Sequence, residues 1–265
     1  MKIPFIKAHG TGNDFIIFLE DECPLTIRDS NFIKNICNRH KGVGADSVLV
    51  LSNEQDLDYR MDYYNSDGSW ETMCANGARC AAMVMYQGGK CGKQIRFVSG
   101  DGEHQVEILN NKMVRLKMSV PRFQSEVLKI EGFLGRHVDS GATHFVTEVE
   151  EFSIEQATQY APKIRYSKAF YPRGINVNFY EFIDISTLKV ISYEKGVEKV
   201  MLSCGSGSVA AAFYAEQEHR LESPLTVQVS GGELVLEFDE KWQNVWLTGP
   251  AVIVFESNID INVFE

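Results

Sequence analysis

The sequence predicts an α+β protein made of two pseudo-symmetric domains, each a set of antiparallel strands wrapped around one central helix. A cysteine directly precedes an alanine-rich, helix-favouring stretch twice, at Cys74 and at Cys204. In addition, residues 96–108 and 226–238 resemble each other as a strand, a turn and a strand. From the cysteine to the serine of that turn there are 25 residues in the first half (99 − 74) and 26 in the second (230 − 204). A spacing this constant indicates an internal repeat.

The first half consists of short apolar or alternating runs separated by Gly, Asn and Asp turns. Asp29 and Ser30 predict the start of a helix over residues 31–39. A second helix is expected after Cys74, so this cysteine is predicted to lie on a helix entry turn. Strands are expected at residues 5–9, 15–18, 47–51, 59–64, 94–98, 104–109 and 114–118.

The second half follows a similar order. A short helix is expected over residues 153–160 and another after Cys204. A strand and turn are expected within residues 137–144, and further strands at 176–180, 188–193, 225–229, 233–238, 245–247 and 251–255. The chain of 265 residues suits two domains of about 130 residues each. We expect domains at residues 1–119 and 120–251, with a C-terminal strand at 252–265 that joins the first domain.

The net charge, the apolar runs and the cysteine pattern exclude some classes of partner and indicate a cellular location. The net charge of −10 argues against nucleic acid or an anionic membrane as the partner. No apolar run approaches the ~18 residues of a membrane span, and the N-terminus lacks the pattern of a signal peptide. We therefore expect a cytoplasmic protein with reduced thiols. The six cysteines contain no C-x-x-C pair, so a metal site is not expected.

Seven motifs of the chain resemble those of the diaminopimelate epimerase family. They lie at residues 10–15, 42–46, 65–69, 74–80, 173–178, 193–197 and 204–207. The resemblance covers nearly the whole chain, and its two cysteine motifs are the specific part. It implies a homodimeric amino-acid epimerase, an isomerase that needs neither pyridoxal phosphate nor a metal. The implied reaction converts LL-diaminopimelate to meso-diaminopimelate in lysine and peptidoglycan-precursor biosynthesis.

The residue types at the two helix entrances suit this chemistry. Inverting a carbon next to a carboxylate requires a base on one face and an acid on the other, and the Cys74 and Cys204 sulfurs can supply both. Free N–H groups and the positive end of a helix favour a thiolate at such positions. They also stabilise the charge that develops on the substrate carboxylate. We expect the two helix entrances to face each other across a cleft. The N–H groups expected to bind the carboxylate belong to Ala75, Asn76, Gly205 and Ser206.

The resemblance also implies a set of substrate-binding side chains. Asn13, Asn65 and Asn176 would hold polar groups of the substrate, and Glu194 its ammonium group. Lys195 stands where the family has an arginine that grips the distal carboxylate. A lysine lacks the planar two-pronged fork of arginine.

Three further positions depart from the family pattern. Ala75 follows the first cysteine in place of a glycine, which matters little if only the backbone N–H is used. Ala142 replaces a substrate-binding asparagine, and Ser47 stands where a glutamine is common. The thiol motifs are therefore intact, while the motifs for the far end of the substrate are altered.

Two alternatives remain at the level of the sequence. One is a racemase with the same machinery and another amino-acid substrate. The other is a redox module in which Cys74 and Cys204 form a switchable disulfide. Exchange of the substrate α-hydrogen in heavy water separates the two enzymes from the redox module.

Overall fold

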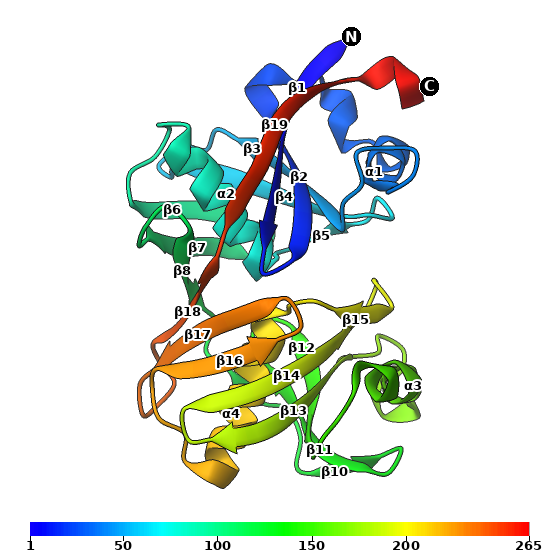
Figure 1. Cartoon of the computed structure of the whole chain (residues 1–265), viewed down its shortest axis with the longest axis vertical. Helices are drawn as coiled ribbons and strands as arrows, with labels where there is room; N and C mark the ends of the chain where they lie inside the picture. The colour runs from blue at the N-terminus through cyan, green and yellow to red at the C-terminus, as the bar shows by residue number, and fades with distance from the viewer. Residues whose placement is uncertain (265) are drawn as a thin grey trace. The chain divides into compact units, whose positions relative to one another are not determined.

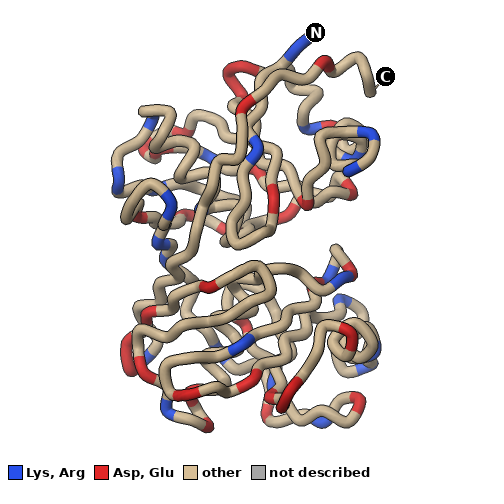
Figure 2. Tube along the Cα trace, viewed as in Figure 1, with Lys and Arg blue, Asp and Glu red and all other residues tan. Residues whose placement is uncertain are grey.

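The computed structural model describes residues 1–264, which form two compact units (Figure 1). The first unit combines residues 1–116 with the chain from residue 249 onward, and the second contains residues 117–248. The described chain contains nineteen strands, four α-helices and four short 3-10 helices. The predicted α+β class with two domains is confirmed. Acidic and basic residues are interspersed along the chain of each unit (Figure 2).

One run of paired strands forms the framework of the first unit. Its spatial order is β19, β1, β2, β3, β4, β6, β7 and β8, and the short β5 also pairs with β4. The strands are β1 (Lys2–Gly10), β2 (Asn13–Leu19), β3 (Ser47–Ser52), β4 (Tyr59–Asn65), β5 (Trp70–Glu71), β6 (Gln94–Ser99), β7 (Gly102–Ile108), β8 (Met113–Met118) and β19 (Val252–Asp260). The C-terminal strand β19, red in Figure 1, lies beside the N-terminal strand β1.

The second unit repeats this arrangement and adds one short strand, β9. Its spatial order is β10, β11, β12, β13, β14, β16, β17 and β18, with the short β15 on β14 and β9 on β11. The strands are β9 (Arg122–Phe123), β10 (Leu128–Ile130), β11 (Phe133–Asp139), β12 (Thr143–Glu148), β13 (Asn176–Asp184), β14 (Thr187–Glu194), β15 (Lys199–Met201), β16 (Leu225–Val229), β17 (Gly232–Phe238) and β18 (Val245–Pro250).

Two neighbouring strand pairs in each unit are parallel, where the sequence predicted antiparallel strands throughout. They are β2 with β3 and β4 with β6 in the first unit, and β12 with β13 and β14 with β16 in the second. An antiparallel pair can be closed by a short turn, whereas a parallel pair needs a crossover. The helices provide these crossovers: α1 (Ser30–Cys37) and α2 (Ala75–Gln87) in one unit, α3 (Ile154–Arg165) and α4 (Gly205–His219) in the other.

The central helix of each unit is buried on nearly all sides. Every residue of α2 from Ala75 to Met85 is buried, and α4 is almost as enclosed. A helix that is apolar all round is stable only inside a core, and alanine side chains let strands approach it closely. Among residues 1–264, no helix is both long and apolar enough to cross a membrane.

The outer helices begin at side-chain caps. The Asp29 carboxylate accepts the backbone N–H groups of Asn31 and Phe32 at the start of α1, as predicted. Ser153 forms a capping box with Gln156 at the start of α3. This helix runs through Pro162 to Arg165, five residues beyond the predicted end. The sequence prediction stopped before the proline, but burial of Ala161 and Ile164 against the sheet extends the helix.

Close packing of α4 generates one stability prediction. A Cβ atom built on Gly207 would lie 2.2 Å from the Asn178 side-chain nitrogen of β13. We expect Gly207→Ala to lower the free energy of unfolding by about 1–3 kcal/mol through overpacking. Urea unfolding followed by circular dichroism measures this. Gly92→Ala is the control, because its added Cβ would meet nothing within 4 Å. An unchanged unfolding midpoint for Gly207→Ala would contradict the expectation.

Candidate active site

Cys74 is the residue immediately before helix α2. Its backbone is extended, and its carbonyl accepts the first helical hydrogen bond from the Ala78 N–H at 2.8 Å. The sulfur is half-buried and lies 3.8 Å from the Asn13 Oδ1 atom. The first N–H groups of a helix have no partner inside it, so the entrance beside this sulfur carries a positive electrostatic potential.

Cys204 has the same position before helix α4. The Ser208 N–H and hydroxyl both donate to its carbonyl at 2.9 Å, which fixes the first turn. Burial raises the pKa of the Cys204 thiol well above its usual value, and the charge and hydrogen bond of the Glu194 carboxylate raise it further. The Gly207 N–H and the Ser206 hydroxyl act in the opposite direction. Cys204 is therefore protonated at neutral pH before any substrate binds.

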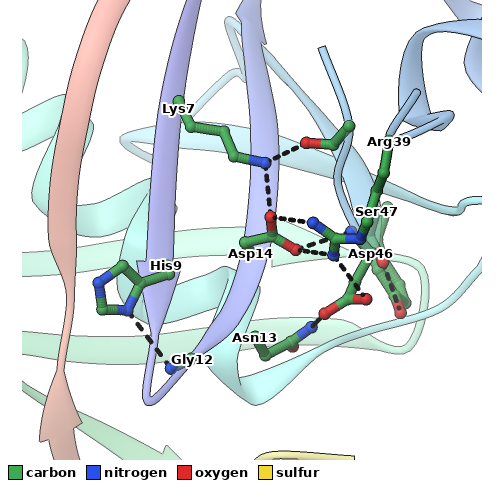
Figure 3. A network of polar contacts seen from close by, with 10 residues as sticks. Lys7, His9, Gly12, Asn13, Asp14, Arg39, Asp46 and Ser47 are labelled. Carbon is green, nitrogen blue, oxygen red and sulfur yellow. Dashed lines mark hydrogen bonds and ion pairs between the residues drawn. The ribbon is translucent and has the colours of Figure 1, made fainter. Parts of the chain in front are cut away.

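The Asn13 amide connects Cys74 to a cluster of charges. Its Nδ2 atom donates to Asp46 Oδ2 at 3.0 Å (Figure 3). Its Oδ1 atom accepts from Asn76 Nδ2 at 3.2 Å. Arg39 then bridges Asp46 and Asp14 with contacts of 3.1 and 2.7 Å. Asn13 is only 5% exposed, so the amide is held on both sides by protein groups.

The Asp14 carboxylate anchors the far end of this cluster. Lys7 donates to it at 2.6 Å, and Arg39 binds it with two nitrogens. Burial alone would raise the pKa of Asp14, but the hydrogen bonds from Arg39 and Lys7 outweigh it and hold the pKa well below the usual range. Asp14 thus stays ionised at neutral pH, and its ion pairs give the start of β2 a fixed geometry.

Arg79 is a fully buried cation inside α2. One terminal nitrogen donates to the Ala75 carbonyl at 3.2 Å, and the other to Asn76 Oδ1 at 2.7 Å and Thr11 Oγ1 at 3.3 Å. Within residues 1–264 these acceptors are neutral, and no carboxylate pairs with this guanidinium. Burial lowers the pKa of Arg79, while the nearby thiols Cys80 and Cys74 act to raise it. A positive charge this close to Cys74 favours a thiolate electrostatically.

A different polar chain supports Cys204 in the second unit. Ser206 Oγ lies 3.8 Å from the Cys204 sulfur and 3.1 Å from His144 Nε2. His144 Nδ1 lies 2.7 Å from Asn178 Oδ1, and Asn178 Nδ2 donates to Ser192 Oγ at 2.6 Å. The Asn178 oxygen must accept, so Nδ1 carries the proton and Nε2 accepts from the Ser206 hydroxyl. Burial lowers the pKa of His144 to about 4, so the ring is neutral.

Two of the predicted substrate-binding asparagines hold local structure. Asn65 accepts a hydrogen bond from the Tyr63 hydroxyl at 2.7 Å and donates to Ser69 Oγ at 3.2 Å. Asn176 accepts from the backbone N–H of Lys195 at 2.9 Å and donates to the Thr143 carbonyl at 3.0 Å. The Lys195 side chain is exposed. Asn176 therefore connects the start of β13 to the loop after β14.

An ion pair between Glu198 and Arg165 holds the loop after β14 in place. Glu198 accepts from Arg165 of α3 at 3.0 Å and from the Gly196 N–H at 3.0 Å. Arg165 also donates to the Arg173 carbonyl. Gly174 leaves the space for this guanidinium, because a Cβ there would lie 1.3 Å from an Arg165 nitrogen. The Glu194–Glu198 segment is thus a fixed part of the second unit.

Within each unit the structure brings several predicted residues together. Cys74, Asn13 and Asn76 are in contact, as are Cys204, Glu194 and Ser206. Sequence reasoning missed Asp46, Arg79 and His144 as supports. Arg79 could have been noticed as a lone charge in an otherwise apolar helix. Asp46 meets the start of β2 only because β2 and β3 pair in parallel, which no local signal reveals.

Comparison with known proteins places the chain in a family. A family model described as Diaminopimelate epimerase matches residues 5–124 and 136–254. The chain belongs to the diaminopimelate epimerase family. The diaminopimelate epimerase of Aquifex aeolicus (strain VF5) is 32% identical over an alignment covering 98% of this chain and 99% of that protein. The one from Archaeoglobus fulgidus is 35% identical, with 99% and 98% covered. The resemblance inferred from the motifs is confirmed, and the chain is an isomerase.

Solved structures share the fold at low sequence identity. A probable proline racemase from Agrobacterium radiobacter K84 gives a TM-score of 0.72 at 13% identity, covering 97% of this chain and 93% of that chain. A hydroxyproline epimerase from Agrobacterium vitis gives 0.69 at 12% identity, covering 97% and 92%. The family fold therefore extends to proteins whose sequences have diverged widely from this one. In residues 1–264, no group of three or more His, Cys, Asp or Glu side chains is arranged to hold a metal.

The buried neutral histidine predicts a pH effect on stability. Between pH 6.5, its ordinary pKa, and about 4, the unfolded chain binds a proton that the folded His144 does not. Stability therefore falls as the pH drops through this window, by about 3 kcal/mol in total from this group. We expect His144→Gln to be less stable at pH 7 but to lose less stability between pH 7 and 4.5. Urea midpoints at both pH values measure it.

The exposed His40 provides the control, because His40→Gln should keep the wild-type dependence. A His144→Gln protein whose midpoint falls with pH as steeply as that of wild type would contradict the assignment.

Proposed function

We propose that this isomerase inverts the α-carbon of LL-diaminopimelate to give the meso form, with Cys74 and Cys204 as acid and base. The observation that carries the proposal is the repeated placement of one cysteine before the buried central helix of each unit. Family membership supports the substrate class, because the relatives are diaminopimelate epimerases. A proton leaves one face of the α-carbon for one sulfur, and the other sulfur delivers a proton to the opposite face.

The helix entrances would bind the substrate carboxylate. The N–H groups of Ala75 and Asn76 begin α2, and those of Gly205 and Ser206 begin α4. Negative charge grows on this carboxylate as the α-proton leaves, so fixed N–H donors stabilise the transition state more than the ground state. This machinery uses no pyridoxal phosphate and no metal in our proposal.

Glu194 would bind the ammonium group on the reacting carbon. Its carboxylate already hydrogen-bonds the Cys204 thiol, which would lie beside the same carbon. An ammonium group at Glu194 would neutralise the charge that raises the pKa of Cys204. Substrate binding would thereby make Cys204 easier to deprotonate. Asn13, Asn65 and Asn176 would contact the remaining polar groups of the substrate.

The first test removes each thiol. We expect Cys74→Ala and Cys204→Ala each to reduce epimerisation by at least ~10²–10⁴, because each group carries one proton transfer. Activity is followed as α-hydrogen exchange and stereoisomer formation from LL-diaminopimelate in heavy water. Cys91→Ala is the matched control, since Cys91 lies after α2 and outside both motifs. Near-normal activity in either of the first two variants would rule out the two-thiol mechanism.

The exposed Lys195 favours a second candidate, a racemase for another amino acid. Lysine offers a point charge where arginine would make two parallel hydrogen bonds to a carboxylate. We expect Lys195→Arg to raise kcat/KM for LL-diaminopimelate by up to about tenfold, which corresponds to ~1.4 kcal/mol. Kinetics with diaminopimelate, lysine, glutamate, histidine and arginine measure the preference. A monocarboxylate amino acid that turns over faster than diaminopimelate in wild type would select the second candidate.

A further inference from the structure

The Asn13 amide lies between Cys74 and Asp46, and its orientation decides what Cys74 faces. The amide nitrogen is 3.0 Å from an Asp46 carboxylate oxygen, and the amide oxygen is 3.8 Å from the Cys74 sulfur. An amide has a donor end and an acceptor end of nearly the same shape. Turning it over would present N–H to the sulfur instead of oxygen. The neighbouring groups must therefore select one orientation.

Asp46 selects the orientation from one side. An ionised carboxylate only accepts hydrogen bonds, so it must face the Asn13 nitrogen. Arg39 contacts the other Asp46 oxygen at 3.1 Å, and the Asp46 N–H donates to Asp14 at 2.9 Å. Figure 3 shows Asp46 between Arg39 and Asn13. The carboxylate is thus held with one oxygen toward the amide.

Arg79 selects the same orientation from the other side. A guanidinium only donates, so Asn76 must turn its oxygen toward Arg79, at 2.7 Å. The Asn76 nitrogen then faces Asn13, whose oxygen accepts from it at 3.2 Å. Both ends of the chain of amides therefore require the Asn13 oxygen to point toward Asn76 and Cys74.

We propose that Asp46 is a positioning residue that, through Asn13, holds Cys74 as the protonated thiol in the resting enzyme. A thiol can donate to the amide oxygen, whereas a thiolate would face a lone pair. This orientation opposes the helix entrance and Arg79, which both favour a thiolate. Asp46 accepts a hydrogen bond from Asn13 directly, so its effect on Cys74 can pass through the amide as well as through its charge.

The consequence of this assignment for the reaction rests on the proposed two-thiol function. Cys74 then enters as the acid: its S–H bond breaks, the proton goes to the α-carbon, and a thiolate remains. Cys204 has by then released its own proton to solvent on substrate binding. The α-proton from the opposite face goes to this Cys204 thiolate, forming an S–H bond there. One proton is taken up and one delivered, so the charge of the pair is unchanged by the inversion.

The test measures the reactivity of Cys74 directly in the full-length protein. Iodoacetamide alkylates the thiolate, and peptide mapping by mass spectrometry isolates the rate at Cys74 from the rates at the other cysteines. We expect Asp46→Asn to move the midpoint of the rate-against-pH curve down by about one unit, a roughly tenfold faster reaction at pH 7. The reason is that the amide introduced at position 46 can accept as well as donate, so one of the two selections is lost and only the Asn76–Arg79 contact still favours the Asn13 oxygen facing the sulfur.

A double-mutant cycle separates the amide from simple charge. In an Asn13→Ala background the amide is absent, so Asp46→Asn should move the midpoint much less. Equal shifts in both backgrounds would show a charge effect and overturn the proposal, as would no shift in either. The Asp46→Asn substitution also removes a charge from the cluster. A second measurement therefore uses the wild-type protein, in which the S–H stretching band reports a protonated thiol. The infrared band that disappears in Cys74→Ala must be present at pH 8, and its absence there overturns the proposal.

These readouts are independent of turnover. A wild-type protein that fails to exchange the α-hydrogen of any amino acid would reject the proposed function and leave the alkylation result in place. An active epimerase with unchanged Cys74 reactivity in Asp46→Asn would reject the inference alone.

Discussion

The structure depends on the burial of one helix in each unit. A cysteine directly precedes the first turn of each of these helices. Burial of α2 and α4 fixes their positions against the strands. Many of the side chains that pack between helix and strands are alanines. The N–H groups at each entrance then point in a direction set by the core rather than by a mobile loop. Chemistry that needs fixed donors therefore follows from the packing of the whole unit.

The repeated topology carries two different electrostatic environments. Cys74 lies near the buried Arg79 and faces a neutral amide oxygen, whereas Cys204 lies beside the carboxylate of Glu194. A repeat with identical surroundings would give two sulfurs of equal basicity. The divergence of side chains on a common framework gives the two sulfurs different basicities instead.

Much of the fold and the cysteine positions could be predicted from the sequence, because strand period, capping residues and repeat spacing are local signals. The helix entrances at Cys74 and Cys204 and the cap at Asp29 follow from such signals. The parallel strand pairs and the supports of the site could not, since they depend on which strands become neighbours. Asp46 and His144 acquire their roles only from residues far away in the chain.

The last strand of the chain has a consequence for how the protein is made. Strand β19 pairs with β1 along almost its full length, from Lys2 with Asp260 to His9 with Val252. During synthesis on a ribosome, one edge of the first unit's sheet therefore stays uncovered until residues 252–260 have been added. The second unit has all of its strands earlier. Although it comes later in the sequence, it is the unit that can finish folding first.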